Sequence, residues 1–278
     1  MMSDSHGMDA DAYSPREIAA RVNDFCVVKA HVPLLALSML GLLAGAFIGL
    51  GALMFALVAS DAGLGFAATR VLGGLAFSLG LILVTVAGAE LFTGNNLLAM
   101  AWASRRVTTR ELLRNWAVVC SANFVGAVGL AGLVWLSGHA EMNDGAVGRM
   151  VIGIATAKAG LSVGEAFFRG VLCNVLVCMA VWMALAGRSV TDKAVAIVFP
   201  ITGFVAAGFE HSIANMYYFP LAMLLGAPLG WTDFARNLVP VIAGNIVGGS
   251  VLVALVYHVI YVRGSANEQH AAIAATDT

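Results

Sequence analysis

Charged side chains are scarce in this chain of 278 residues. Asp, Glu, Lys and Arg make up 11% of it and hydrophobic residues 60%, whereas soluble domains carry about 25% charged residues. This composition excludes a disordered chain and an ordinary cytosolic enzyme. The near balance of 15 basic and 16 acidic residues leaves no basic field for a nucleic acid. The composition therefore indicates a membrane protein.

Cysteine is also sparse, and its four positions are Cys26, Cys120, Cys173 and Cys178, without a Cys-x-x-Cys pair. We expect buried thiols rather than a disulfide or a metal site. The His-Glu-x-x-His and Gly-x-Ser-x-Gly motifs of hydrolases are missing, which makes a membrane-embedded hydrolase built on Glu210 and His211 a remote alternative. The Asn-Pro-Ala turns of water channels are missing too. We expect no enzyme activity, catalytic residue, cofactor or metal.

Six apolar runs are long enough to cross a bilayer, which takes a helix of about 20 residues. They cover residues 32–60, 71–104, 115–138, 170–187, 194–232 and 237–262. The second and fifth runs are too long for one plain helix, and each has ionisable residues near its middle: Glu90 in the second, Glu210 and His211 in the fifth. The sequence therefore predicts an all-α membrane protein with six transmembrane helices, of which the second and fifth are broken.

The amino-terminal residues 1–31 predict a cytoplasmic tail with one short helix. Ser14 followed by Pro15 and Glu17 is typical of a helix start. We expect an amphipathic helix through Val22, Phe25 and Val28 that lies at the membrane surface. The tails and loops on the side of the two termini contain twice as many Lys and Arg residues as the loops on the other side. This distribution predicts that both termini are cytoplasmic. Residues 264–278 form a polar carboxy-terminal tail.

An internal repeat relates residues 32–138 to residues 170–263. An offset of 122 residues aligns Asn123 with Asn245, and an offset of 120 aligns the stretch from Glu90 to Asn95 with that from Glu210 to Asn215. Because each unit has an odd number of spans, its second copy is inserted upside down in the membrane, as in transport proteins. The sequence thus predicts two inverted three-span repeats, joined by an external connection at 139–169, whose breaks meet near the bilayer midplane.

The two breaks contain the candidate functional residues. His211 at membrane depth favours transport or proton relay, because a buried ionisable side chain is costly. Glu90 and Glu210 are proton carriers or, as we favour, structural anchors that accept hydrogen bonds from Asn95 and Asn215. Thr93 and Ser212 are the expected N-caps of the two restarting half-helices. If both N-termini point inward, they attract an anion to the centre.

Two further polar residues stand in apolar surroundings. Lys158 lies in the stretch 151–161, which is too short to span the membrane and predicts a short helix at the external face. There Lys158 either attracts anions into a vestibule or is simply a solvated loop lysine. Asn174, in the middle of the fourth span, needs a hydrogen-bond partner and is expected to face the bundle interior.

Three stretches resemble conserved segments of the formate/nitrite transporter family, and the likeness extends from about residue 29 to residue 263. They read Ala89-Glu90-Leu91-Phe92-Thr93-Gly94-Asn95, Arg169-Gly170-Val171-Leu172-Cys173-Asn174 and Gly208-Phe209-Glu210-His211-Ser212-Ile213-Ala214-Asn215-Met216. The resemblance implies an aquaporin-like protomer, a homopentamer and a location in the bacterial inner membrane.

By that resemblance His211 is the central pore histidine and Thr93 its partner. Lys158, Asn174, Glu210 and Asn215 form the polar group around it. Two apolar constrictions on either side are formed by Phe77, Leu81, Leu91, Phe92, Val177 and Phe204.

The permeant implied is a small monovalent anion of a weak acid, most similar to formate, with nitrite or hydrosulfide as the alternatives. Such a carboxylate is charged at neutral pH, and a bare charge is costly in an apolar constriction. Passage as the neutral acid, with a proton from His211, makes a proton-coupled transporter, whereas passage as the anion makes a voltage-sensitive channel.

Overall fold

The computed structural model describes residues 12–61 and 63–263, and all regular structure within these ranges is helical. Six of its helices are long and apolar enough to cross a membrane, which confirms the all-α class and the number of spans. The predicted carboxy-terminal tail and the first 11 residues of the predicted amino-terminal tail lie outside the described residues.

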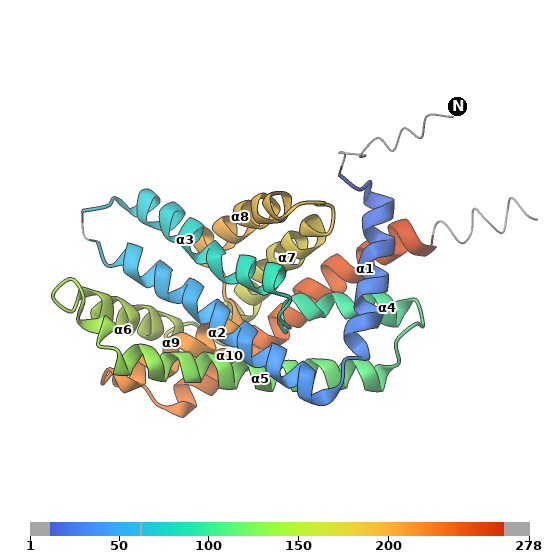
Figure 1. The fold of residues 1–278 in the computed structure, drawn as a ribbon. Helices are drawn as coiled ribbons and strands as arrows, with labels where there is room; N and C mark the ends of the chain where they lie inside the picture. The colour runs from blue at the N-terminus through green and yellow to red at the C-terminus, as the bar shows by residue number, and fades with distance from the viewer. Residues whose placement is uncertain (1–11, 62, 264–278) are drawn as a thin grey trace, which may run out of the picture.

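The membrane helices are α2 (Leu34–Ala59), α3 (Phe66–Ala87), α5 (Thr109–Leu136), α7 (Val163–Ala184), α8 (Val190–Ala207) and a last helix that starts as α10 (Trp231–Ile246) and continues through the π-helical segments η3 (Val247–Leu255) and η4 (His258–Arg263) (Figure 1). The shorter elements are α1 (Pro15–Ala30), η1 (Gly94–Leu97), α4 (Leu98–Ala103), η2 (His139–Glu141), α6 (Ala146–Ala159) and α9 (Ser212–Leu224).

Several membrane helices begin before the apolar runs because their first turns are charged. The helices α5, α7 and α8 each start with a capping box, in which a Ser or Thr side chain and an acidic residue three positions later exchange hydrogen bonds with the backbone. The acidic residues are Glu111, Glu165 and Asp192. A carboxylate in the first turn also interacts favourably with the positive end of the helix dipole.

The helices pack closely where glycines face a neighbouring backbone. A Cβ atom at Gly126 of α5 would lie 1.9 Å from the carbonyl oxygen of Leu42 in α2. At Gly248 of η3, a Cβ would lie 2.2 Å from the carbonyl oxygen of Val171 in α7. Both positions therefore need glycine, since any side chain would separate the two helices.

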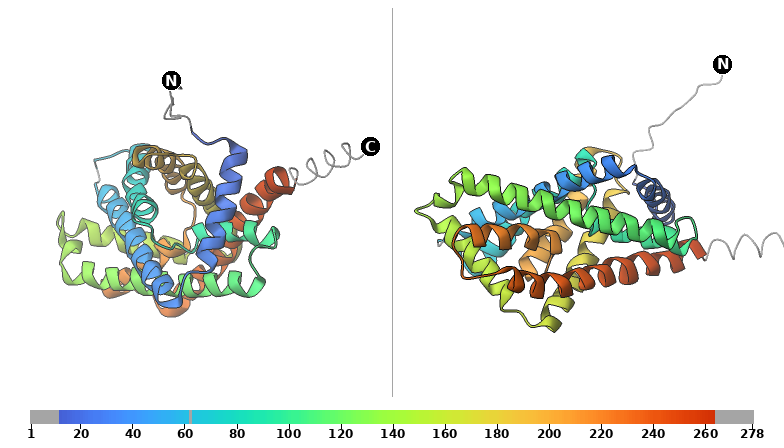
Figure 2. Two further views of the ribbon diagram at one scale, coloured as in Figure 1. Left: turned by 45° about the vertical axis from the view of Figure 1, so that its right-hand side comes forward. Right: turned by 90° about the horizontal axis from the view of Figure 1, so that it is seen from below.

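The short helix α9 lies inside the bundle. It contacts α2, α5, α6 and α10, and in Figure 2 it is seen between α5 and the last membrane helix. Its residues from Ser212 to Ala222 are all buried. The short helix α4 is enclosed in the same way by α1, α5 and η3.

The amino-terminal helix α1 crosses the ends of the membrane helices and packs on α4 and η4 (Figure 1). It begins at the predicted capping residue, since the Ser14 side chain accepts from the backbone N–H of Glu17. Of the expected apolar face, Val22 is buried against the protein, whereas Phe25 is 40% and Val28 67% exposed. The face buried against the protein runs through Ile18, Val22 and Cys26, which are spaced four residues apart. The position of α1 at the membrane surface stays a prediction.

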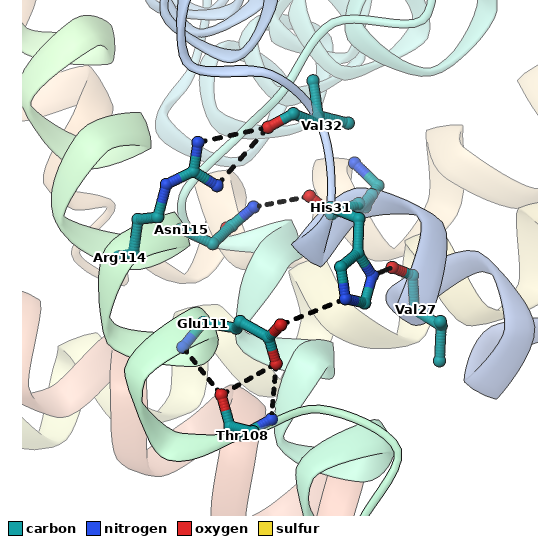
Figure 3. A network of polar contacts seen from close by, with 8 residues as sticks. Val27, His31, Val32, Thr108, Glu111, Arg114 and Asn115 are labelled. Atoms are coloured by element: carbon teal, nitrogen blue, oxygen red, sulfur yellow. Dashed lines mark hydrogen bonds and ion pairs between the residues drawn. The ribbon is translucent and has the colours of Figure 1, made fainter.

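The link between α1 and α2 is tied to the start of α5 (Figure 3). The Arg114 guanidinium donates to the carbonyl of Val32, and the Asn115 side chain donates to the carbonyl of Lys29. The His31 ring contacts the carboxylate of Glu111. These contacts fix the position of Lys29, whose Nζ lies 2.8 Å from the carboxylate of Glu90.

Candidate functional site

Two non-helical stretches meet inside the bundle. One lies between α3 and η1, and the other between α8 and α9. They begin at Gly88 and Gly208, whose positive φ angles of 81° and 75° turn the chain away from the preceding helix axis. They end at Thr93 and His211, both buried, with 3.1 Å between Thr93 Oγ1 and His211 Nε2.

The His211 ring has a defined hydrogen-bonding pattern. Its Nδ1 accepts from the backbone N–H of Ala214 at 3.2 Å, so the ring proton lies on Nε2. Nε2 is then the donor to Thr93 Oγ1. This arrangement is that of a neutral imidazole whose single N–H points at the other stretch of chain.

Of the two predicted N-caps, Thr93 stands at the N-cap position of η1, whereas Ser212 is wrong. His211, not Ser212, caps α9 with its own ring nitrogen, and Ser212 is the first residue of that helix. The Thr93 side chain makes no capping hydrogen bond to η1, and its hydroxyl contacts His211 instead. An imidazole at Ncap accepts a backbone hydrogen bond as a hydroxyl does, which the usual capping preferences do not anticipate.

Glu210 is held by a closed set of hydrogen bonds. Lys158 Nζ lies 2.8 Å from its Oε1, and Asn215 Nδ2 donates to its Oε2 at 2.7 Å. The side chain of Asn237 accepts from Asn215 and donates to the backbone carbonyl of Lys158. Both carboxylate oxygens of Glu210 are thus occupied.

The same set surrounds Glu90. Lys29 Nζ lies 2.8 Å from Oε1 of Glu90, and Asn95 Nδ2 donates to Oε2 at 2.7 Å. Asn115 accepts from Asn95 and donates to the backbone carbonyl of Lys29. Lys29 was not among the predicted site residues, because the sequence indicated only a basic residue of the tail. The repeat contains a signal for it: if Glu210 is paired with a cation, the matching Glu90 needs a cation as well.

Two asparagines hold the non-helical backbone. Asn123 accepts from the N–H of Phe92 at 2.9 Å and donates to the carbonyl of Glu90 at 2.9 Å. Asn245 accepts from the N–H of Ser212 at 3.0 Å and donates to the carbonyl of Glu210 at 3.1 Å. The repeat aligned these asparagines without revealing this role.

Asn174 also lies at the junction, as its mid-span position suggested. Its Nδ2 is 3.2 Å from the carbonyl oxygen of Thr93 and 2.7 Å from that of Asn245. It therefore links the Thr93 stretch to the last membrane helix rather than contacting His211.

Two cavities lie on opposite sides of the junction. The Lys158 cavity, of about 220 Å³, is lined by residues that include Lys158, Glu210, His211, Phe77 and Phe204. The Lys29 cavity, of about 180 Å³, is lined by residues that include Lys29, Glu90, Leu81 and Leu91.

Four of the six predicted constriction residues thus line a cavity. Phe92 and Val177 line neither cavity and are packed in the hydrophobic core. The rings of Phe77 and Phe204 meet edge to face with centroids 5.6 Å apart, and Phe204 also stacks on His211 at 5.8 Å. Aromatic rings therefore line the Lys158 cavity beside the imidazole.

The formate/nitrite transporter family model matches residues 16–259. The chain belongs to the formate/nitrite transporter family. It is 39% identical to the formate channel FocA of Escherichia coli strain K12 over 280 residues, covering 94% of this chain and 98% of that one. It is 36% identical to the formate channel FocA of Haemophilus influenzae over 275 residues, covering 92% and 97%.

Solved structures of this family have the same fold. A pentameric formate channel with formate bound is 37% identical, with a TM-score of 0.76 over 82% of this chain and 98% of that one. An ion channel of the family is 29% identical, with a TM-score of 0.77 over 87% of this chain and 96% of that one. The chain is therefore a multi-pass membrane protein of a channel and transporter family, not of an enzyme family.

Proposed function

We propose that this chain conducts formate across the bacterial inner membrane through a path that connects the two cavities past His211. The observation that carries the proposal is the buried contact between His211 and Thr93, because His211 lines the Lys158 cavity and Leu91, two residues before Thr93, lines the Lys29 cavity. The names of the relatives support formate as the permeant.

The physical argument starts from the cost of moving a carboxylate through an apolar constriction. Lys158 and Lys29 are each paired with a glutamate, so the positive charge that concentrates an anion comes from Arg70 and Arg169 at the first cavity and from Lys193 at the second. Beyond them the permeant meets Phe204 or Leu91 and leaves water. Less polar surroundings raise the proton affinity of a carboxylate. The N–H of His211 is then the group placed to donate a hydrogen bond or a proton to it.

We further propose that the two halves, residues 32–138 and 170–263, are inverted repeats with broken second and fifth spans. The matched hydrogen bonds support this arrangement: Lys29, Glu90 and Asn95 on one side make the same contacts as Lys158, Glu210 and Asn215 on the other. Residues 139–169 then form the external connection, and both termini lie in the cytoplasm, consistent with the distribution of Lys and Arg.

A homopentamer is the proposed assembly, because the similar formate channel is named as pentameric. Each protomer then carries its own path, since both cavities are lined by one chain. The outer apolar faces of the protomers would contact lipid and one another.

Flux into liposomes tests the proposal. The purified protein is reconstituted, and uptake of formate, nitrite and hydrosulfide is followed by stopped-flow light scattering at two pH values. We expect formate to enter faster than through empty liposomes and at a pH-dependent rate. Faster uptake of nitrite or hydrosulfide alone assigns one of these anions instead. No uptake of any of the three contradicts the proposal, and chemical conversion of the anion would indicate an enzyme.

A further inference from the structure

Arg70 of α3 binds the end of another helix at the wall of the Lys158 cavity. Its Nε donates to the carbonyl of Ala206 at 3.0 Å, and its Nη2 donates to that of Val205 at 2.5 Å. Both carbonyls belong to the last turn of α8, which ends at Ala207. The guanidinium also lies over the ring of Phe55, with 5.5 Å to the centroid. Arg70, Phe55 and Val205 all line the cavity.

The bound carbonyls belong to an exposed helix end. The last four carbonyls of a helix lack partners within it, and the aligned peptide dipoles give that end about half a negative charge. Backbone N–H groups of Gly208 and Phe209 reach the carbonyls of Val205 and Phe204. The carbonyl of Ala206 receives its hydrogen bond from Arg70. An anion in the cavity would otherwise meet a negative helix end next to His211.

The residue before the bound pair is Phe204, whose ring contacts both Phe77 and His211. A guanidinium that fixes two successive carbonyls also fixes the turn from which Phe204 projects. Its planar fork suits this task, because a lysine ammonium presents a point charge on a flexible stem.

We propose that Arg70 is a positioning and specificity residue: it cancels the negative end of α8 at the Lys158 cavity and holds Phe204 against His211. This inference rests on the proposed function, in that the permeant is an anion. The sequence alone indicates only a loop charge at position 70. The inference gives Arg70 two separable effects: it attracts the anion from one side of the membrane, and it fixes the ring of Phe204 beside His211.

The test compares Arg70→Met, Arg70→Lys and the unmodified protein in right-side-out and inverted vesicles, with formate flux measured over a range of formate and salt concentrations. Arg70→Met should raise the half-saturating formate concentration about three- to tenfold for entry from the Lys158 side at low salt. The increase should shrink at high salt, because screening weakens exposed electrostatic interactions. Arg70→Lys should recover the half-saturating concentration but not the maximal flux, because it restores the charge without the fork.

Arg149→Met is the matched control, because Arg149 is exposed on α6, donates to the carbonyl of Asp144 and lies outside the cavity lining. Equal changes from both sides of the membrane, or a change independent of salt, would overturn the inference. If Arg70→Met does not purify as a folded protein, the split between half-saturation and maximal flux in Arg70→Lys decides it. Absence of formate flux through the unmodified protein contradicts the proposed function instead, and the comparison is then made with whichever of nitrite or hydrosulfide passes.

Discussion

His31 at the end of α1 and Glu111 at the start of α5 are joined by a contact of 3.1 Å between Nε2 and Oε1. The other ring nitrogen, Nδ1, lies 2.8 Å from the carbonyl oxygen of Val27. Both neighbours are acceptors, so only the imidazolium fills both hydrogen bonds with a donated proton. The neighbouring charged groups are Glu111 and Arg114 on α5 and Lys29 on α1 (Figure 3).

The first prediction is that the contact of His31 with Glu111 holds α1 in place, so that His31→Ala loosens α1. Cys26 reports the packing: burial raises the pKa of its thiol to about 12, which suppresses the reactive thiolate while α1 is in place. The rate of maleimide labelling of Cys26 should be about two- to fivefold higher in His31→Ala than in the unmodified protein, since exposed ion pairs contribute up to about 1 kcal/mol.

His139→Ala is the control for that experiment, because His139 lies in η2, which packs on α5 and α6. Its labelling rate should equal that of the unmodified protein. An unchanged labelling rate in His31→Ala would disprove the role of His31.

The second prediction concerns proton coupling at the centre. His211→Phe removes the N–H that faces Thr93 while keeping a ring for Phe204 to stack on. We expect a folded assembly of unchanged size whose formate flux no longer varies with pH, measured by liposome uptake and size-exclusion chromatography. Thr93→Val, which keeps the imidazole, should retain the pH dependence. If flux through His211→Phe varies with pH as in the unmodified protein, the assigned role is wrong.

The third prediction concerns the buried ion pair of Lys158 and Glu210, whose side chains are 15% and 4% exposed. Lys158→Met leaves the carboxylate without its cation, which should lower the free energy of unfolding by about 3–5 kcal/mol. The double variant Lys158→Met, Glu210→Gln should lose less, because no unpaired charge remains. Thermal unfolding in detergent measures both. A double variant that is less stable than Lys158→Met would contradict this account of the pair.

The fourth prediction tests the approach of α2 to α5. Gly126→Ala places a methyl group 1.9 Å from the carbonyl oxygen of Leu42 and should destabilise the protein by at least about 1–3 kcal/mol through overpacking. Gly129→Ala on the same helix is the matched control, since no atom lies within 4 Å of its Cβ position. Its unfolding temperature should stay the same or rise. Similar losses in both variants would show that the close contact with Leu42 is not the reason for glycine at position 126.

Hydropathy predicted the six spans because transfer into lipid is a local property of each segment. The pairing of Glu210 with Asn215 was also within reach, because the two residues are close in sequence and repeat at Glu90 and Asn95. In both pairs the glutamate lies in the non-helical stretch and the asparagine in the helix that follows it, five residues on.

The missed features depend on contacts between distant segments. Lys29 and Arg70 act on Glu90 and on the end of α8, which are 61 and 136 residues away along the chain. Counting Lys29 and Arg70 as loop charges that orient the protein in the membrane gives no information on such contacts. The face of α1 that is buried on α4 also depends on such a contact, because Ile18, Val22 and Cys26 meet residues of a distant segment.

Each lysine beside the proposed path is matched by one carboxylate, Lys29 by Glu90 and Lys158 by Glu210. A membrane potential acts on net charge, and the work it does on a neutral pair that moves as a unit is close to zero. The two pairs therefore give the protein no gating charge of its own. A current through the protein then reports the charge that the permeant carries, because a formate that crosses with a proton carries no net charge.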